Sequence, residues 1–77
     1  MLQEKRIRYR ILVNGSRGAM VMLVQNRLKA MGFYKGVCDG IFENSLEDAV
    51  ARYKKDRHFE LTKQIGYIEL RDLFIIE

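Results

Sequence analysis

Hydrophobic residues recur at helical spacing in three stretches of the chain, separated by glycine-rich or polar segments. Apolar residues at steps of three and four positions share one face of a helix. The pattern predicts helices near 17–31, 44–57 and about 67–74. The residues expected to face the core are Val21, Val24, Gln25, Leu28 and Met31 in the first helix, Leu46, Ala49, Val50 and Tyr53 in the second, and Leu70, Leu73 and Phe74 in the third.

The ends of the predicted helices carry recognisable signals. Ser16 is expected to cap the first helix, because its hydroxyl can accept a backbone N–H of the first turn. Gly32 is expected to end that helix, since glycine readily takes the left-handed conformation found after many helices. Asn44, followed three residues later by Glu47, is close to a capping box at the start of the second helix.

Residues 5–13 follow a different pattern, in which basic and apolar residues alternate. Period two with β-branched residues predicts a strand. A lone strand needs a partner for its backbone groups, and the candidates are the apolar run 74–76, a neighbouring domain or a second copy of the chain. Arg6, Arg8 and Arg10 are expected on one face of the strand, and Ile7, Tyr9, Ile11 and Val13 on the other.

The two connections between the predicted helices also contain apolar residues. The 32–43 connection has three glycines and Asp39, which favour tight turns. Together, these patterns predict an all-α fold: a small three-helix bundle with an N-terminal extended strand, divided into a basic segment 1–14 and a domain 15–77. The side chains expected to hold the connections against the core are Phe33, Val37, Ile41 and Phe42 in the first, and Phe59 and Leu61 in the second.

Composition limits the chain to one domain, because it has 77 residues. Its net charge is +4, with the basic excess concentrated in the first 17 residues. A basic surface attracts nucleic acid, anionic lipid or a phosphate-rich cell wall, or it is simply a solvated face. No apolar run approaches the roughly 18 residues needed to span a bilayer, and the N-terminus lacks the apolar stretch of a signal peptide.

The residue types needed for catalysis or metal binding are scarce. The single histidine, His58, and the single cysteine, Cys38, are far apart in the sequence, whereas a zinc site needs three or four clustered ligands. No Ser-His-Asp or Cys-His set can be assembled around one histidine. We therefore expect no catalytic residue, no metal and no cofactor. Cys38 cannot form an internal disulfide, and its role stays open.

Several short motifs follow one another in a fixed order. Gly15 to Gly18 leads the first helix, Val24-Gln25 lies within it, Gly32-Phe33-Tyr34 and Asp39-Gly40-Ile41-Phe42 form turns, and Ala49-Val50-x-x-Tyr53 lies in the second helix. In order and spacing these motifs resemble the first peptidoglycan-binding domain family over residues 15–74. The resemblance implies a non-enzymatic module that binds the bacterial or phage-targeted cell wall and anchors an associated hydrolase there.

The chain departs from the pattern of this family at several positions. The family usually has glycine at Glu43, threonine at Leu46 and glutamine at Lys54. Because the retained positions mostly build the fold, an alternative is a protein-interaction or self-association module, acting through residues 5–13, that has lost wall binding. Nucleic-acid binding is less favoured, because the third helix carries two acidic residues, Glu69 and Asp72, that would repel phosphates.

The resemblance also implies a shallow groove between the first helix, the Asp39 turn and the second helix, which would hold a glycan or stem peptide. The candidate ligand-binding residues are Gln25, Tyr34, Asp39, Tyr53 and Lys54. Tyr34 is expected to be an exposed aromatic, whereas the ring of Tyr53 should be buried with its hydroxyl at a rim. Gln25 and Asp39 have an alternative role, since each can instead bind loop backbone. The module would work at the cell wall or outside the cell if exported within a longer chain, and otherwise stay in the cytoplasm until lysis.

Overall fold

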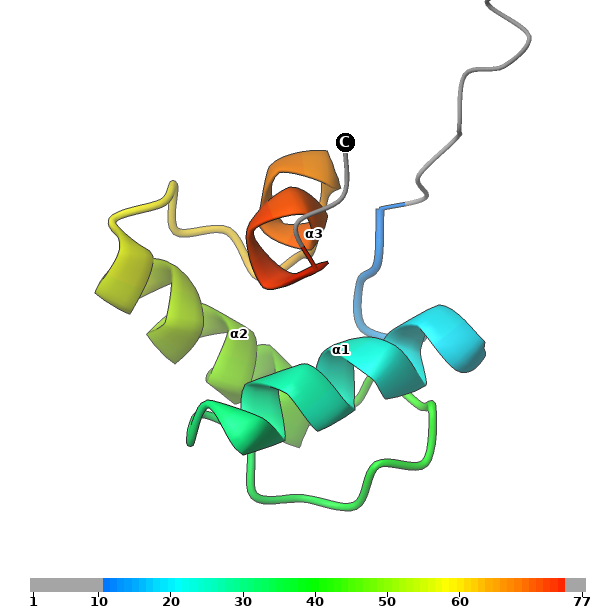
Figure 1. Ribbon diagram of the computed structural model, residues 1–77. Helices are drawn as coiled ribbons and strands as arrows, with labels where there is room; N and C mark the ends of the chain where they lie inside the picture. The colour runs from blue at the N-terminus through cyan, green and yellow to red at the C-terminus, as the bar shows by residue number, and fades with distance from the viewer. Residues whose placement is uncertain (1–10, 75–77) are drawn as a thin grey trace, which may run out of the picture.

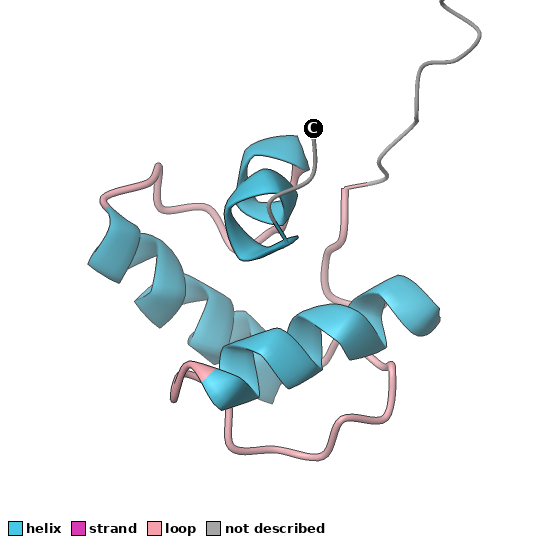
Figure 2. Ribbon diagram, viewed as in Figure 1, coloured by secondary structure: helices cyan, strands magenta, loops and turns pink. Residues whose placement is uncertain are grey.

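The computed structural model describes residues 11–74, and within them the expected all-α architecture is confirmed (Figures 1 and 2). The three helices lie close to their predicted bounds, although the first begins later than residue 17. The helix α2 packs against α1, and α3 crosses above both of them in the view of Figure 1. The helices are α1 (Ala19–Ala30), α2 (Asn44–Arg57) and α3 (Tyr67–Phe74).

The start of α1 differs from the predicted Ser16 cap, which is wrong. The Ser16 hydroxyl instead accepts the backbone N–H of Val13 at 2.9 Å. Arg17 pairs with Ile41 in an isolated antiparallel bridge, which keeps the chain extended as far as Gly18. Gly18 occupies the N-cap position without any side-chain cap. The helix therefore begins only where pairing with the 32–43 connection stops.

The predicted capping box of α2 is also wrong. Asn44 is the first residue of α2, and its side-chain oxygen accepts a hydrogen bond from the Asn14 amide at 2.9 Å. Glu43 occupies the N-cap position, and its carbonyl accepts the N–H groups of Leu46 and Glu47, both at 3.0 Å. The asparagine thus joins the segment before α1 to the start of α2 instead of capping its own helix.

Both long helices end in the same hydrogen-bond pattern. After α1, Gly32 has a φ of 89° and its N–H donates to the Lys29 carbonyl at 3.0 Å, which confirms the predicted helix stop. After α2, His58 takes the equivalent left-handed conformation with a φ of 63° and donates to the Lys55 carbonyl at 3.2 Å. The Phe59 N–H then reaches back into the last turn of α2, so the chain reverses beside the helix.

The core contains most of the apolar faces predicted for the three helices, with Tyr34, Phe42 and Ile65 added from the connections. Met31 and Phe74, also expected to face the core, are only partly buried. Two residues expected to face inward are instead exposed: Val37, and Leu61 with 66% of its surface accessible. In the second connection Ile65 is buried in place of Leu61, because it pairs with Leu12. The buried core consists of Leu12, Val21, Val24, Leu28, Tyr34, Phe42, Leu46, Ala49, Val50, Tyr53, Ile65, Leu70 and Leu73.

The predicted strand is not seen in the described part of the segment, residues 11–13. Leu12 instead forms an isolated bridge with Ile65, with N–H···O distances of 2.8 and 2.9 Å. Leu12 is 6% exposed whereas Ile11 is 55% exposed, so within residues 11–13 the face predicted to be apolar is not the buried one. Residues 5–10 and 75–77 lie outside the described residues, and self-association through 5–13 stays a prediction.

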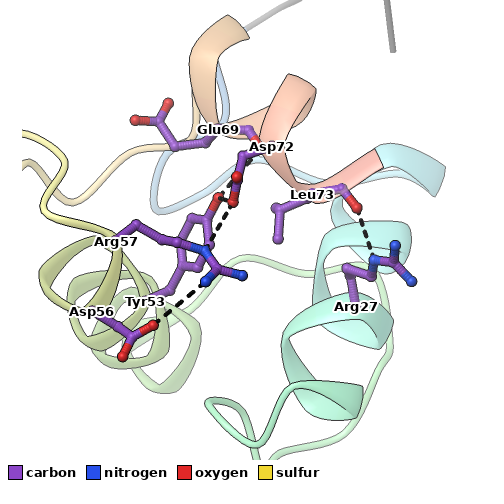
Figure 3. Close-up of polar contacts among 7 residues, drawn as sticks. All are labelled: Arg27, Tyr53, Asp56, Arg57, Glu69, Asp72 and Leu73. Carbon is purple, nitrogen blue, oxygen red and sulfur yellow. Dashed lines mark hydrogen bonds and ion pairs between the residues drawn. The ribbon is translucent and has the colours of Figure 1, made fainter. Parts of the chain in front are cut away.

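Contacts to α3 come from both other helices. The Arg27 side chain of α1 donates to the Leu73 carbonyl at 2.7 Å, which occupies a backbone acceptor at the end of α3 (Figure 3). Among residues 11–74, no helix is long and apolar enough to cross a membrane.

The left-handed conformation of His58 leads to a stability prediction. A side chain in this conformation costs about 1–2 kcal/mol, whereas glycine adopts it freely but loses more backbone entropy on folding. We expect His58→Gly to raise the free energy of unfolding by about 1 kcal/mol, and therefore Tm by about 4–8 °C. Ala51→Gly, inside α2, should lower the free energy of unfolding by about 1 kcal/mol. Thermal unfolding followed by circular dichroism would measure both, and a lower Tm for His58→Gly would contradict the argument.

Candidate functional site

The side chain of Gln25 lies fully buried on the core face of α1 and binds the 32–43 connection. Its oxygen accepts the Gly40 N–H at 2.7 Å. Its nitrogen lies 3.1 Å from the Ile41 carbonyl and 3.2 Å from oxygens of Tyr34 and Asp39. Because an amide nitrogen has only two N–H groups, these three acceptors share two donors. The Gln25 amide thus makes the hydrogen bonds to the backbone of the 32–43 connection that another backbone segment would otherwise make.

Tyr34 lies in the same network and is 4% exposed, so the expectation of an exposed aromatic is wrong. Its hydroxyl donates to the Val37 carbonyl at 2.7 Å, which folds the ring over the following turn. The turn passes so close that a Cβ at Gly36 would lie 2.6 Å from the Tyr34 hydroxyl oxygen. Glycine at this position therefore permits the burial of the ring.

Asp39 is exposed and closes its own turn. Its carboxylate accepts the Ile41 N–H at 3.0 Å in addition to its contact with Gln25. The hydrogen bond from Ile41, followed by that from Gln25, lowers the pKa of the Asp39 carboxyl below its usual range. The three candidates thus lie together, with Tyr34 and Asp39 each bound to Gln25.

Tyr53 projects from α2 towards α3 (Figure 3). Its ring is buried as expected, but the whole side chain is 0% exposed, so the expectation of a hydroxyl at a rim is wrong. The hydroxyl instead donates to an Asp72 carboxylate oxygen at 2.6 Å. The Nε of Arg57 approaches the same oxygen at 3.1 Å. Burial, followed by the bond to Asp72, raises the pKa of the Tyr53 phenol far above its usual value, so the hydroxyl remains a donor. Tyr53 therefore joins α2 to α3.

Lys54 is 2% exposed, although it carries a charge. Its ammonium group lies 2.5 Å from the Thr62 hydroxyl and 3.4 Å from the Glu69 carboxylate. The second oxygen of Glu69 accepts the Gly66 N–H at 2.7 Å. A buried charge needs such partners to offset its desolvation. Together these bonds hold the 58–66 connection against α2 and α3.

Two small clefts lie along the 58–66 connection, and Thr62 lines both. Of the five candidate residues, Lys54 alone lines either cleft, and no residue of the Asp39 turn does. The Lys54 cleft, of about 230 Å³, is lined by Lys54, Glu60, Thr62, Gln64, Gly66, Tyr67, Ile68 and Glu69. The basic cleft, of about 240 Å³, is lined by Ala51, Arg52, Lys55, Leu61, Thr62 and Lys63.

Sequence reasoning missed the basic cleft, although one signal for it was present. The second helix carries a run of basic residues, including Arg52 and Lys55, that can be interpreted as a solvated face. Nothing in the sequence indicates that Leu61 and Lys63 fold back beside them.

Among residues 11–74, no three His, Cys, Asp or Glu side chains gather where they could hold a metal ion. Cys38 is half-buried against the core.

Residues 11–74 thus form a three-helix fold with tightly bound connections and small surface clefts. Residues 17–67 match the model of the peptidoglycan binding domain family. The chain belongs to this family, as the order of its motifs predicts.

Solved structures agree with this assignment. The SleB N-terminal domain superposes with a TM-score of 0.83 at 25% identity, covering 88% of this chain and 93% of that one. The endolysin of Burkholderia phage AP3 superposes with a TM-score of 0.78 at 26% identity over 84% of this chain. This chain spans 25% of the length of that endolysin. No curated protein sequence matches the chain.

The Gln25 network leads to a second stability prediction. Gln25→Leu keeps the size of the side chain but leaves the buried Gly40 N–H without its acceptor. We expect the free energy of unfolding to fall by about 2–4 kcal/mol, because unsatisfied buried polar groups each cost about 1–3 kcal/mol. Asn26→Leu, at the exposed neighbouring position, should change it by less than about 0.5 kcal/mol. Urea denaturation would measure both, and equal effects would show that the network contributes little.

The lowered pKa of Asp39 predicts a dependence of stability on pH. A carboxyl whose pKa is lower in the folded state stabilises the protein above its unfolded pKa, and that contribution is lost as pH falls through the folded value. We expect Asp39→Asn to be less stable than the unchanged chain at neutral pH, with the difference shrinking as the pH falls below about 4. Thermal unfolding across this range would test it, and a constant difference between the two proteins would contradict it.

Proposed function

We propose that this chain is a non-catalytic module that binds peptidoglycan and holds an attached or associated hydrolase at the cell wall. The observation that carries the proposal is the family match over residues 17–67. The likeness to one quarter of a phage endolysin supports it, because such a share fits one module of a larger wall-degrading protein.

The described polar clusters serve the fold of the module in this proposal. The polar atoms of Gln25, Tyr53 and Lys54 are each bonded to other parts of the fold. A catalytic nucleophile needs an adjacent base and an open reacting position, whereas these groups are buried. The proposed role is therefore to retain wall polymer without reacting with it.

The five candidate residues support wall binding in different ways in this proposal. Lys54 binds Thr62, which lines both clefts, so it is the one of the five that positions a cleft residue. Gln25, Tyr34, Asp39 and Tyr53 act as positioning residues that hold the connections and helices in register.

The small clefts imply weak binding by one module. A volume of about 230 or 240 Å³ lies below the roughly 300–1,000 Å³ of pockets for drug-sized ligands. Weak attachment is still useful, because tethering a hydrolase to its polymer raises the local concentration of substrate. In this proposal the module works at the cell wall, either within a longer exported chain or after lysis releases it.

Binding to purified, washed peptidoglycan sacculi tests the function. We expect the intact chain to sediment with sacculi at low salt, because the wall presents many weak sites along one insoluble polymer. Sacculi digested to soluble fragments beforehand should leave the chain in the supernatant, which controls for aggregation. If the folded chain stays in the supernatant with intact sacculi at low salt, the proposed function is wrong.

A further inference from the structure

The basic cleft combines an apolar floor with a rim of three cations. We propose that it binds the carboxylate-bearing stem peptide of peptidoglycan, and not the glycan strand. This inference rests on the proposed function and names the part of the polymer that the module recognises.

The walls of the basic cleft are fixed by the fold. Arg52 and Lys55 lie three residues apart on α2, so they project from neighbouring positions on one face. The left-handed turn at His58 reverses the chain and returns residues 61–63 along the helix. The bond from Lys54 to Thr62 then holds this segment in place at 2.5 Å. A preformed cleft loses little entropy when it binds a ligand.

The charged residues that line the basic cleft are all cationic. Arg52, Lys55 and Lys63 line it, and no acidic residue does. Within residues 11–74, the side chains of Lys55 and Lys63 make no ion pair. Arg52 donates one N–H to the Phe33 carbonyl at 3.1 Å, which orients the guanidinium and leaves other donors available. Cations without counter-charges, gathered in a concave site, favour an anionic ligand.

The apolar residues that line the basic cleft indicate which kind of anion it binds. Leu61 is 66% exposed and lies beside Ala51, so the cleft offers methyl groups as well as charge. Burying such apolar area is favourable by roughly 25 cal/mol per Å². A stem peptide carries carboxylates next to the methyl groups of alanine residues, which matches both features. A neutral sugar ring has no anionic group with which the three cations could form ion pairs.

The Lys54 cleft has the opposite chemistry. Its lining includes two carboxylates, Glu60 and Glu69, and its one cation, Lys54, is already paired with Glu69. A carboxylate ligand would meet like charge there. Because the Lys54 cleft contains carboxylates and the basic cleft contains only cations, we assign the carboxylate-bearing part of the polymer to the basic cleft.

Titrations of the isotope-labelled intact chain, followed by nuclear magnetic resonance, test the assignment. The probes are free stem peptides released from sacculi, a neutral N-acetylglucosamine oligomer in place of the glycan, and a linear polyphosphate. We expect stem peptides to bind and to shift backbone resonances of residues 51–63. Binding of glycan or polyphosphate at this cleft, without binding of stem peptide, would overturn the inference.

Charge-removing variants make the test specific. Lys55→Gln and Lys63→Gln should each weaken stem-peptide binding about two- to fivefold, as expected for exposed ion pairs. Leu61→Asp should abolish it by placing a negative charge on the floor. Arg17→Gln removes the same charge just before α1, whose start lies at the opposite end of the molecule from the 58–66 connection, and should leave affinity within about twofold (Figure 1). These residues are exposed, so the variants should fold, which thermal unfolding would verify.

The sacculus experiment tests the proposed function, and the peptide experiment tests the cleft assignment, so the two can be contradicted independently. If the unchanged chain sediments with sacculi but Lys55→Gln and Lys63→Gln bind stem peptides as it does, the cleft assignment is wrong and the proposed function stands. If the unchanged chain does not sediment with sacculi, both are wrong.

Discussion

One buried amide, the side chain of Gln25, determines how the longest connection of this protein lies against its helices. Its oxygen and nitrogen bind the Asp39–Ile41 turn and Tyr34, which leaves the buried polar groups of that turn satisfied. Because the turn is held there, Ile41 can pair with Arg17 and Phe42 can enter the core. The starts of α1 and α2 are thereby fixed relative to each other, without a disulfide between them.

Lys54 plays a comparable part for the second connection. Like Gln25, it is a polar residue on the core-facing side of a helix, and its head group binds a segment distant in the sequence. A small domain buries a limited apolar area. Hydrogen bonds of this kind therefore fix connections that hydrophobic packing alone would hold only weakly. The same two residues deviate most clearly from the apolar pattern of their helices.

Scaffold and binding surface are largely separate in this molecule. Residues of the motifs that resemble the family, such as Gln25 and Asp39, are engaged in internal bonds. The basic cleft depends on Arg52, Lys55 and Lys63, which lie outside those motifs. A scaffold of this kind can keep its fold while its rim residues change, which means that fold and ligand preference need separate evidence.

The sequence by itself determined the three helices, most of their buried faces and the stop at Gly32, because each of these follows from local spacing and backbone preference. The Gln25 and Asp39 bonds were also foreseeable as one of two alternatives. Only the tertiary structure decided that Leu12 and not Ile11 is buried, that Tyr34 is covered, and that the caps at Ser16 and Asn44 are absent. It also decided that Leu61 lies at the surface beside Lys63, Arg52 and Lys55. Several of these outcomes depend on a partner from a distant part of the chain, such as Ile65 for Leu12, Ile41 for Arg17 or Asn14 for Asn44, and no local pattern identifies that partner.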